Sequence, residues 1–192
     1  MKLLHVDSSI LGQHSASREL SAAIVARWQD SVPGLEVTYR DLEAAPLPHL
    51  SGASLAAADP GETANAAQVL REFLDADVVV VGAPMYNFGI PSTLKAWIDR
   101  LAVAGKTFHY TEQGPKGLAG GKQLIVASSR GGFHLDAPSD FQEPYLRFVF
   151  GFFGIADVEF VRAEGLAISP EQRAVSMAGA LASIRTPLAH AA

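Results

Sequence analysis

The chain has 192 residues, 48% hydrophobic and 18% charged, which is the balance of a well-packed globular protein and excludes a disordered one. Its net charge of −5 argues against a nucleic-acid binder, and its lack of cysteine excludes disulfides, thiolate metal sites and cysteine nucleophiles. No apolar run approaches the roughly 20 residues of a membrane span or the core of a signal peptide, so we expect a cytoplasmic protein without a membrane partner.

Five apolar segments predict the strands of a single sheet. They lie at residues 2–7, 35–40, 78–81, 123–127 and 158–163. The third is Val78-Val79-Val80-Val81, and four consecutive valines indicate a strand buried on both faces, because a half-exposed strand would alternate apolar with polar.

A helical pattern follows each strand. The positions expected to face the core are Leu20, Ile24, Trp28, then Ala66, Val69, Leu70, Phe73, Leu74, then Leu94, Trp97, Ile98, Leu101, then Phe141, Tyr145, Phe148, Val149, Phe152, and finally Ala174, Met177, Leu181, Ile184, Leu188. Strands linked by helical crossovers form a parallel sheet covered on both faces. We therefore predict an α/β fold, a flavodoxin-like doubly wound sheet of five parallel strands in the order 2-1-3-4-5, with residues 1–192 as one domain. Residues 41–60 and 106–121 are interpreted as irregular excursions.

In this order the first, third and fourth strands end side by side, so the loops that follow them converge. The first loop, residues 8–17, has Ser9, Ser15 and Ser17 just before a helix, where free N–H groups and the helix dipole favour an anion. A serine that merely caps the helix is the alternative.

The other two loops have complementary chemistry. Residues 83–91 supply the flat or soft side chains Met85, Tyr86 and Phe88, with an amide at Asn87. Residues 128–134 contain Ser-Arg-Gly-Gly, and glycine allows a planar ligand to approach the backbone closely. A phosphate cradle beside an aromatic, amide-bearing pocket fits a flavin mononucleotide (FMN).

Other nucleotide and metal motifs fail. No G-x-G-x-x-G follows the first strand, and Gly105-Lys106-Thr107 ends a helix and lacks the first glycine of a P-loop. The six histidines include no pair at metal-ligand spacing, so we predict no metal site.

The combined motifs resemble the FMN-dependent NADH-azoreductases, also described as NADH:quinone oxidoreductases. The segments that carry the resemblance are Ser9, Ser15-Ala16-Ser17, Pro84-Met85-Tyr86-Asn87-Phe88, Ile90-Pro91, residues 105–111, residues 114–118, Ser129-Arg130-Gly131-Gly132 and residues 163–165. They extend over nearly the whole chain. The excursion at residues 41–65 is shorter than in some members, which affects the outer rim of the expected cleft.

The resemblance implies one non-covalent FMN per subunit, and NADH as the electron donor. It implies cofactor contacts by Ser9, Ser15, Ala16, Ser17, Pro84, Met85, Tyr86, Asn87, Phe88, Ser129, Arg130, Gly131 and Gly132. It places Asn87, Tyr110, His134 and Phe152 beside the substrate, in a cleft that two subunits of a homodimer share. The alternative for Phe152 is a position in the hydrophobic core. His134 could donate a proton to the substrate, and the alternative donor is water.

The implied reaction passes a hydride from NADH through FMN to a quinone or an azo compound by a ping-pong mechanism, and no residue acts as a nucleophile. Cleavage of an azo bond to two amines takes two such cycles. A flavodoxin-type electron carrier and an NADPH-preferring quinone reductase of the same fold are the alternative functions. Carriers are usually strongly acidic, whereas the charge here is only −5.

Overall fold

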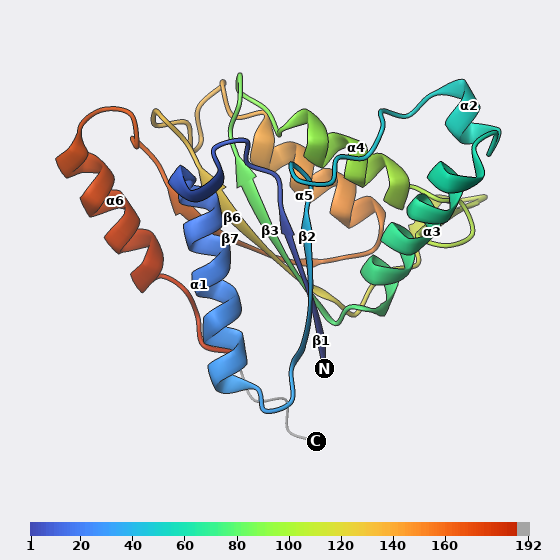
Figure 1. Ribbon diagram of the computed structural model, residues 1–192, viewed down its shortest axis with the longest axis horizontal. Coiled ribbons are helices and arrows are strands. Elements are labelled where there is room, and N and C mark those ends of the chain that lie inside the picture. Colours follow the sequence, from blue (N-terminus) through green and yellow to red (C-terminus); the bar gives the residue numbers. More distant parts are fainter. Residues whose placement is uncertain (188–192) are drawn as a thin grey trace.

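The protein, seen in a computed structural model that describes residues 1–187, is built on five parallel strands (Figure 1). In spatial order they are β2 (Glu36–Asp41), β1 (Lys2–Asp7), β3 (Val78–Pro84), β6 (Gln123–Ser129) and β7 (Asp157–Ala163). Counted along the chain, the sheet strands follow the predicted order 2-1-3-4-5, so the flavodoxin-like topology is confirmed.

The valine strand is the centre of the sheet. Val79 pairs with Leu4 of β1 on one side and Leu124 of β6 on the other, and every residue of β3 is buried. A strand with neighbours on both edges and helices on both faces has no polar surroundings, which is why its sequence does not alternate.

Helices cover both faces of the sheet (Figure 1). α1 (Ala16–Ser31) and α6 (Pro170–Ala182) pack on one face, and α3 (Pro60–Asp75), α4 (Ser92–Leu101) and α5 (Gln142–Phe152) pack on the other. Two short helices, η1 (Gly12–His14) and α2 (Gly52–Leu55), lie in the connections. Within residues 1–187, no helix combines the length and the apolar character needed to cross a membrane.

Most of the predicted core positions are buried or half-buried, and on α5 Tyr145, Val149 and Phe152 are half-buried against the core. The other two aromatic positions predicted there are exposed. Phe141 and Phe148 are 65% and 77% exposed, whereas Leu146, Phe150 and Phe153 are fully buried. Both sets have helical spacing, and the face that meets the sheet is the one next to Phe73 and Trp97 of α3 and α4. On the last helix Ala174 is exposed, and Leu188 lies outside the described residues.

Residues 106–121 were predicted to be irregular, and this prediction is wrong. The segment forms an antiparallel hairpin of β4 (Phe108–Thr111) and β5 (Gly114–Gly117), separate from the main sheet. Each strand has only four residues, too few to show a clear period in the sequence.

The hairpin is held against α5 by a contact that only glycine permits. A Cβ added to Gly117 would overlap backbone atoms of Gly154 and Phe153, which cannot move as a flexible side chain could. Gly117→Ala should therefore lower the free energy of unfolding by about 2 kcal/mol, as overpacking usually does. Gly151→Ala is the matched control, because its Cβ would meet nothing within 4 Å and alanine favours the helix. Urea denaturation of both variants tests this, and equal stability would contradict the close contact.

Candidate functional site

Three loops meet at the carboxyl edge of β1, β3 and β6, the upper edge of the sheet in Figure 1. They enclose a cavity of about 210 Å³. Its wall combines predicted cofactor residues from all three loops, namely Ser9, Ser15, Ala16, Pro84, Met85, Tyr86, Ser129, Arg130 and Gly131. The predicted convergence of these loops is confirmed.

The first end of the cavity is the start of α1. Ser15 is the N-cap, and its Oγ accepts a hydrogen bond from Arg18 N at 3.3 Å, so the capping alternative is also true. The preceding N–H groups of the helix have no intrahelical acceptor and remain for an anion. Ser17 is fully buried, does not line the cavity and shares a 3.0 Å hydrogen bond with Ser15.

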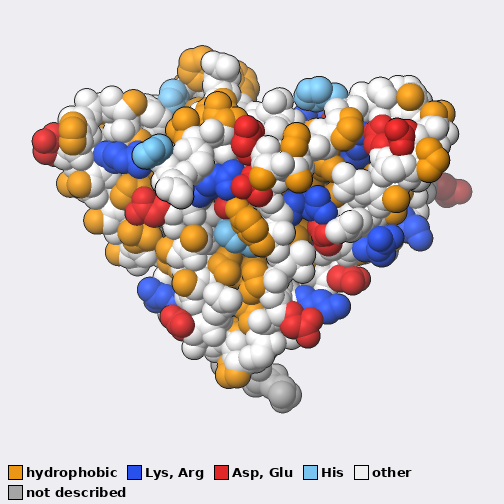
Figure 2. Space-filling model, viewed as in Figure 1, with side chains coloured by type: hydrophobic (Ala, Val, Ile, Leu, Met, Phe, Trp, Pro, Cys, Tyr) orange, Lys and Arg blue, Asp and Glu red, His pale blue; other side chains and the backbone are white. Residues whose placement is uncertain are grey.

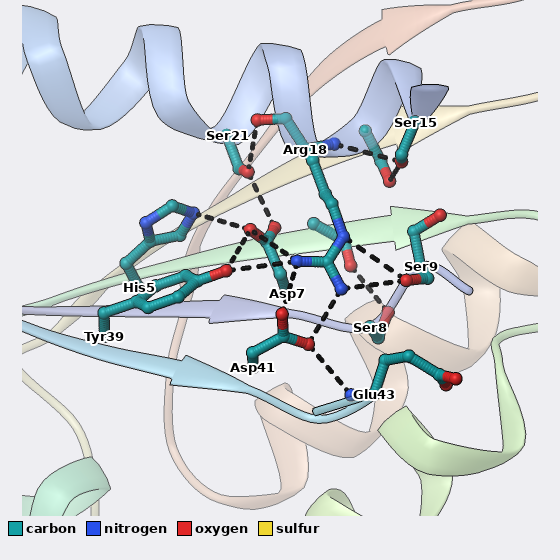
Figure 3. Close-up of polar contacts among 12 residues, drawn as sticks. His5, Asp7, Ser8, Ser9, Ser15, Arg18, Ser21, Tyr39, Asp41 and Glu43 are labelled. Carbon is teal, nitrogen blue, oxygen red and sulfur yellow. Dashed lines mark hydrogen bonds and ion pairs between the residues drawn. The ribbon is translucent and has the colours of Figure 1, made fainter. Parts of the chain in front are cut away.

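The loop before α1 is fixed by Arg18 (Figure 3). Its guanidinium donates two hydrogen bonds to the carbonyl oxygen of Ser9, at 2.9 and 3.3 Å, and two to the Asp41 carboxylate, both at 2.7 Å. The bidentate pair joins the start of α1 to the end of β2, and so it holds Ser9 at the cavity wall.

A buried carboxylate lies under this pair. Asp7 accepts hydrogen bonds from Ser21 at 2.8 Å and from Tyr39 at 3.1 Å, and a Cβ at Gly82 would overlap it. Burial, followed by the charges of Asp7 and Asp41, raises the pKa of Tyr39 to about 12. The phenol therefore stays protonated and keeps donating to Asp7 across the physiological range.

The same cluster should make the free energy of unfolding sensitive to acid. The hydrogen bonds from Arg18 lower the pKa of Asp41 to about 2 from 3.8. A depressed folded-state pKa contributes stability above the unfolded pKa, so this contribution is complete above about pH 4 and is lost as the pH falls to about 2. We expect roughly 1–2 kcal/mol, since the carboxylate is partly exposed.

Urea unfolding at several pH values measures this contribution. The free energy of unfolding of Asp41→Asn should fall less than that of the unchanged protein between pH 4.5 and 2.5. Glu43→Gln, at an exposed carboxylate two residues away, is the control and should leave the slope unchanged. Parallel pH profiles for Asp41→Asn and the unchanged protein would refute the assignment.

The second end of the cavity is a tight turn after β3. The backbones of Tyr86 and Gly89 exchange two hydrogen bonds of 3.0 Å, and both central residues, Asn87 and Phe88, have positive φ (49° and 69°). This is a type I′ turn, in which a bulky residue such as Phe88 is strained. Strain of this kind is concentrated at ligand-binding sites.

The turn is also tied to the first loop. The hydroxyl of Tyr86 lies 3.1 Å from Ser9 Oγ and accepts from Ile10 N at 3.3 Å. Asn87 lines a second hollow of about 600 Å³ beside the first, and Phe88 is 52% exposed. Met85 and Tyr86 therefore line both hollows, whereas Asn87 lines only the second.

The third loop contributes backbone, and its arginine side chain points elsewhere. Arg130 is fully buried and its guanidinium contacts Asp140 (3.0 Å), Glu143 (2.9 Å) and Glu164 (3.2 Å). Its charge is therefore already paired. Gly131 lines the cavity, and Gly132 packs against the ring of His134 outside it.

The predicted substrate residues fall into two groups. His134 packs edge-on against Phe88, with ring centres 5.7 Å apart, so it lies next to Asn87 in the turn. Tyr110 and Phe152 belong to another cluster, in which each contacts Phe108, at 5.5 and 4.5 Å. Neither of them lines the two cavities beside Met85.

Five further residues of the cavity wall were not predicted, namely Leu11, His14, Leu166, Ala167 and Arg173. The last three follow β7, an edge strand, and the loop after this strand was not predicted to reach the site. That loop extends the pairing of β6 with β7, because Leu166 N donates to Arg130 O at 3.1 Å and Ala167 N to Gly131 O at 3.0 Å. The position of Leu166 just beyond a strand end is the signal that could have found it.

Comparison with known proteins agrees with this geometry. Residues 1–188 match the sequence model of a family described as flavodoxin-like fold. An FMN-dependent NADH:quinone oxidoreductase of Stenotrophomonas maltophilia is 64% identical over 96% of this chain and 94% of that protein. One of Rhizobium meliloti is 58% identical over 94% and 93%.

Among solved structures, an azoreductase from Bacillus anthracis superposes with a TM-score of 0.86. It is 30% identical, and the match covers 96% of each chain. The chain described here belongs to the flavodoxin-like family of FMN-dependent NADH:quinone oxidoreductases.

Proposed function

We propose that this protein is an FMN-dependent oxidoreductase that transfers hydride from NADH to quinones and to aromatic azo compounds. The observation that carries the proposal is one cavity in which the start of α1 meets Met85, Tyr86 and the backbone of Gly131. The relatives' names supply the donor and the acceptor classes. Bound FMN would supply the chemistry by accepting a hydride and releasing it to the acceptor.

The residues of the cavity suit the parts of FMN. Ser9, Ser15 and the N–H groups of Ala16 and Ser17 are assigned to the phosphate, because a helix start favours an anion. The side chains of Met85 and Tyr86 and the backbone from Ser129 to Gly132 are assigned to the ring system. Pro84, Asn87 and Phe88 border the same ring, and Arg130 acts through its backbone because its side chain is paired with carboxylates.

We further propose that the protein acts as a homodimer whose cleft lies between the subunits. Tyr110 and Phe152 would then reach the substrate from the partner, where Asn87 and His134 lie in the first subunit. Support comes from the exposure of Phe88, Tyr110, Phe133, Phe141 and Phe148, which are 52–77% exposed. Figure 2 shows hydrophobic side chains at the upper rim of the molecule and also across the middle of this face. Exposed aromatic side chains are enriched at protein interfaces.

We propose a cytoplasmic location, where NADH is produced, and one domain over residues 1–192. The dimer is tested by light scattering, where the monomer mass would count against a shared cleft. Cell fractionation and limited proteolysis test the location and the single domain.

The reaction itself is tested by steady-state kinetics. The purified protein should be yellow and lose its colour anaerobically with NADH. Because donor and acceptor would occupy the same cleft in turn, double-reciprocal plots should give parallel lines, and intersecting lines would contradict this. Values of kcat/KM for benzoquinone and methyl red, with NADH and then NADPH, decide the acceptor and the donor. A protein that takes up no FMN would overturn the proposal, and one that takes it up without reacting with NADH would be an electron carrier.

A further inference from the structure

The wall of the cofactor cavity carries an unusual charge pattern. The chain has 20 acidic and 15 basic residues, yet no acidic residue lines this cavity within residues 1–187. Three residues of the wall can carry a positive charge: His14, Arg130 and Arg173. The cavity is therefore suited to an anion in a protein that is negative overall.

The two arginines of the wall differ in their partners. The Arg130 guanidinium has three carboxylates around it, so its charge is neutralised. Arg173 is half-buried and makes no ion pair or side-chain hydrogen bond within the described part of the chain. A half-buried guanidinium without a protein partner is suited to a ligand that brings its own negative charge.

Arg173 is held in this place by the loop that precedes α6. Backbone hydrogen bonds tie Leu166 and Ala167 to the third loop of the site. Ser169 then caps α6 by accepting from Gln172 N at 3.1 Å, so Arg173 falls in the first turn of the helix. α1 and α6 pack on the same face of the sheet, and the first turns of both helices lie toward its upper edge in Figure 1.

We propose that Arg173 recognises the phosphate of FMN and sets the preference of this protein for FMN over riboflavin. α1 supplies backbone N–H groups and serine hydroxyls to the phosphate, and α6 supplies the full positive charge. The proposal rests on the proposed function, because it takes FMN as the ligand of the cavity.

Flavin binding tests the proposal without reference to turnover. The Kd values of FMN and riboflavin are measured by flavin fluorescence on the full-length protein freed of flavin. Arg173→Gln should weaken FMN binding about 10- to 100-fold, the range of a charge-assisted hydrogen bond, and leave the Kd of riboflavin unchanged. Arg173→Lys should keep most of the preference for FMN. Arg185→Gln, which removes a charge from an 81% exposed side chain, is the control for net charge and should change neither Kd.

Each other result overturns the proposal. Equal weakening of both flavins by Arg173→Gln would indicate a packing role. An unchanged Kd for FMN with a raised KM for NADH would assign Arg173 to the dinucleotide instead. Failure of the unchanged protein to bind any flavin would overturn the proposed function itself, so the two failures are distinguishable.

Discussion

Glutamate in place of Ala16 should weaken FMN binding about 100-fold relative to glutamine at the same position. Ala16 is the first residue of α1, and it lines the cavity together with Ser15 and Met85. A carboxylate here would lie within a few ångströms of a phosphate that carries close to two negative charges, so the two groups would repel each other.

The comparison with Ala16→Gln separates charge from shape, since the two side chains have the same size. Ala16 is only 6% exposed and packs in the core on this face of the sheet, so both longer side chains should lower the stability of the flavin-free protein. Thermal denaturation measures the stability, and fluorescence titration with FMN and riboflavin measures the affinity. The riboflavin affinity should be the same for both variants. Equal FMN affinity would show that the phosphate does not lie at the start of α1.

The architecture could be predicted because its determinants are local or follow general rules. The run Val78–Val81 indicates a central strand by itself, and the handedness and crossover rules leave few ways to order five such strands. Once the order 2-1-3-4-5 is set, Ser9, Met85 and Ser129 must lie at one edge. The three-loop site followed from topology and residue type together.

The errors arose where the outcome depends on partners distant in sequence. On α5, the exposed Phe148 and the buried Phe150 both have neighbours at helical spacing, and only the packing against Phe73 and Trp97 decides which of the two is buried. Burial of apolar surface is equally favourable for either residue until the neighbours are known. The exposure of Phe148 on this aromatic-rich helix therefore cannot be predicted from periodicity alone.

Arg130 illustrates the same point for a charged residue. In the sequence it stands beside two glycines in a ligand loop, so it is expected to contact the cofactor. The carboxylates that pair with it lie 10, 13 and 34 residues further along, at Asp140, Glu143 and Glu164. Conversely, Arg173, which has no carboxylate partner among the described residues, lies on the last helix. The prediction from the three loops did not connect this helix with the site.

Arg130→Met should be the most destabilising single change near the site, lowering the free energy of unfolding by about 3–5 kcal/mol. Glu143 would keep a partner, since Arg162 contacts it at 2.6 Å, but Asp140 and Glu164 would lose their guanidinium. Glu164 also accepts from the N–H groups of His134 and Leu135 at 2.8 and 2.9 Å, so the loop beside the turn at Phe88 depends on the same carboxylate.

A compensating change identifies the cause of this loss. Adding Glu164→Gln to Arg130→Met removes one uncompensated charge and keeps an oxygen that can accept from His134 and Leu135, so the double variant should regain part of the stability. Arg185→Met is the matched control, because its ion pair with Glu159 is at the surface and 3.7 Å long, and it should lose less than about 0.5 kcal/mol. Urea denaturation of the four proteins supplies the values. A loss below about 1 kcal/mol for Arg130→Met would mean that water replaces the guanidinium, and then the third loop does not depend on the buried ion pairs.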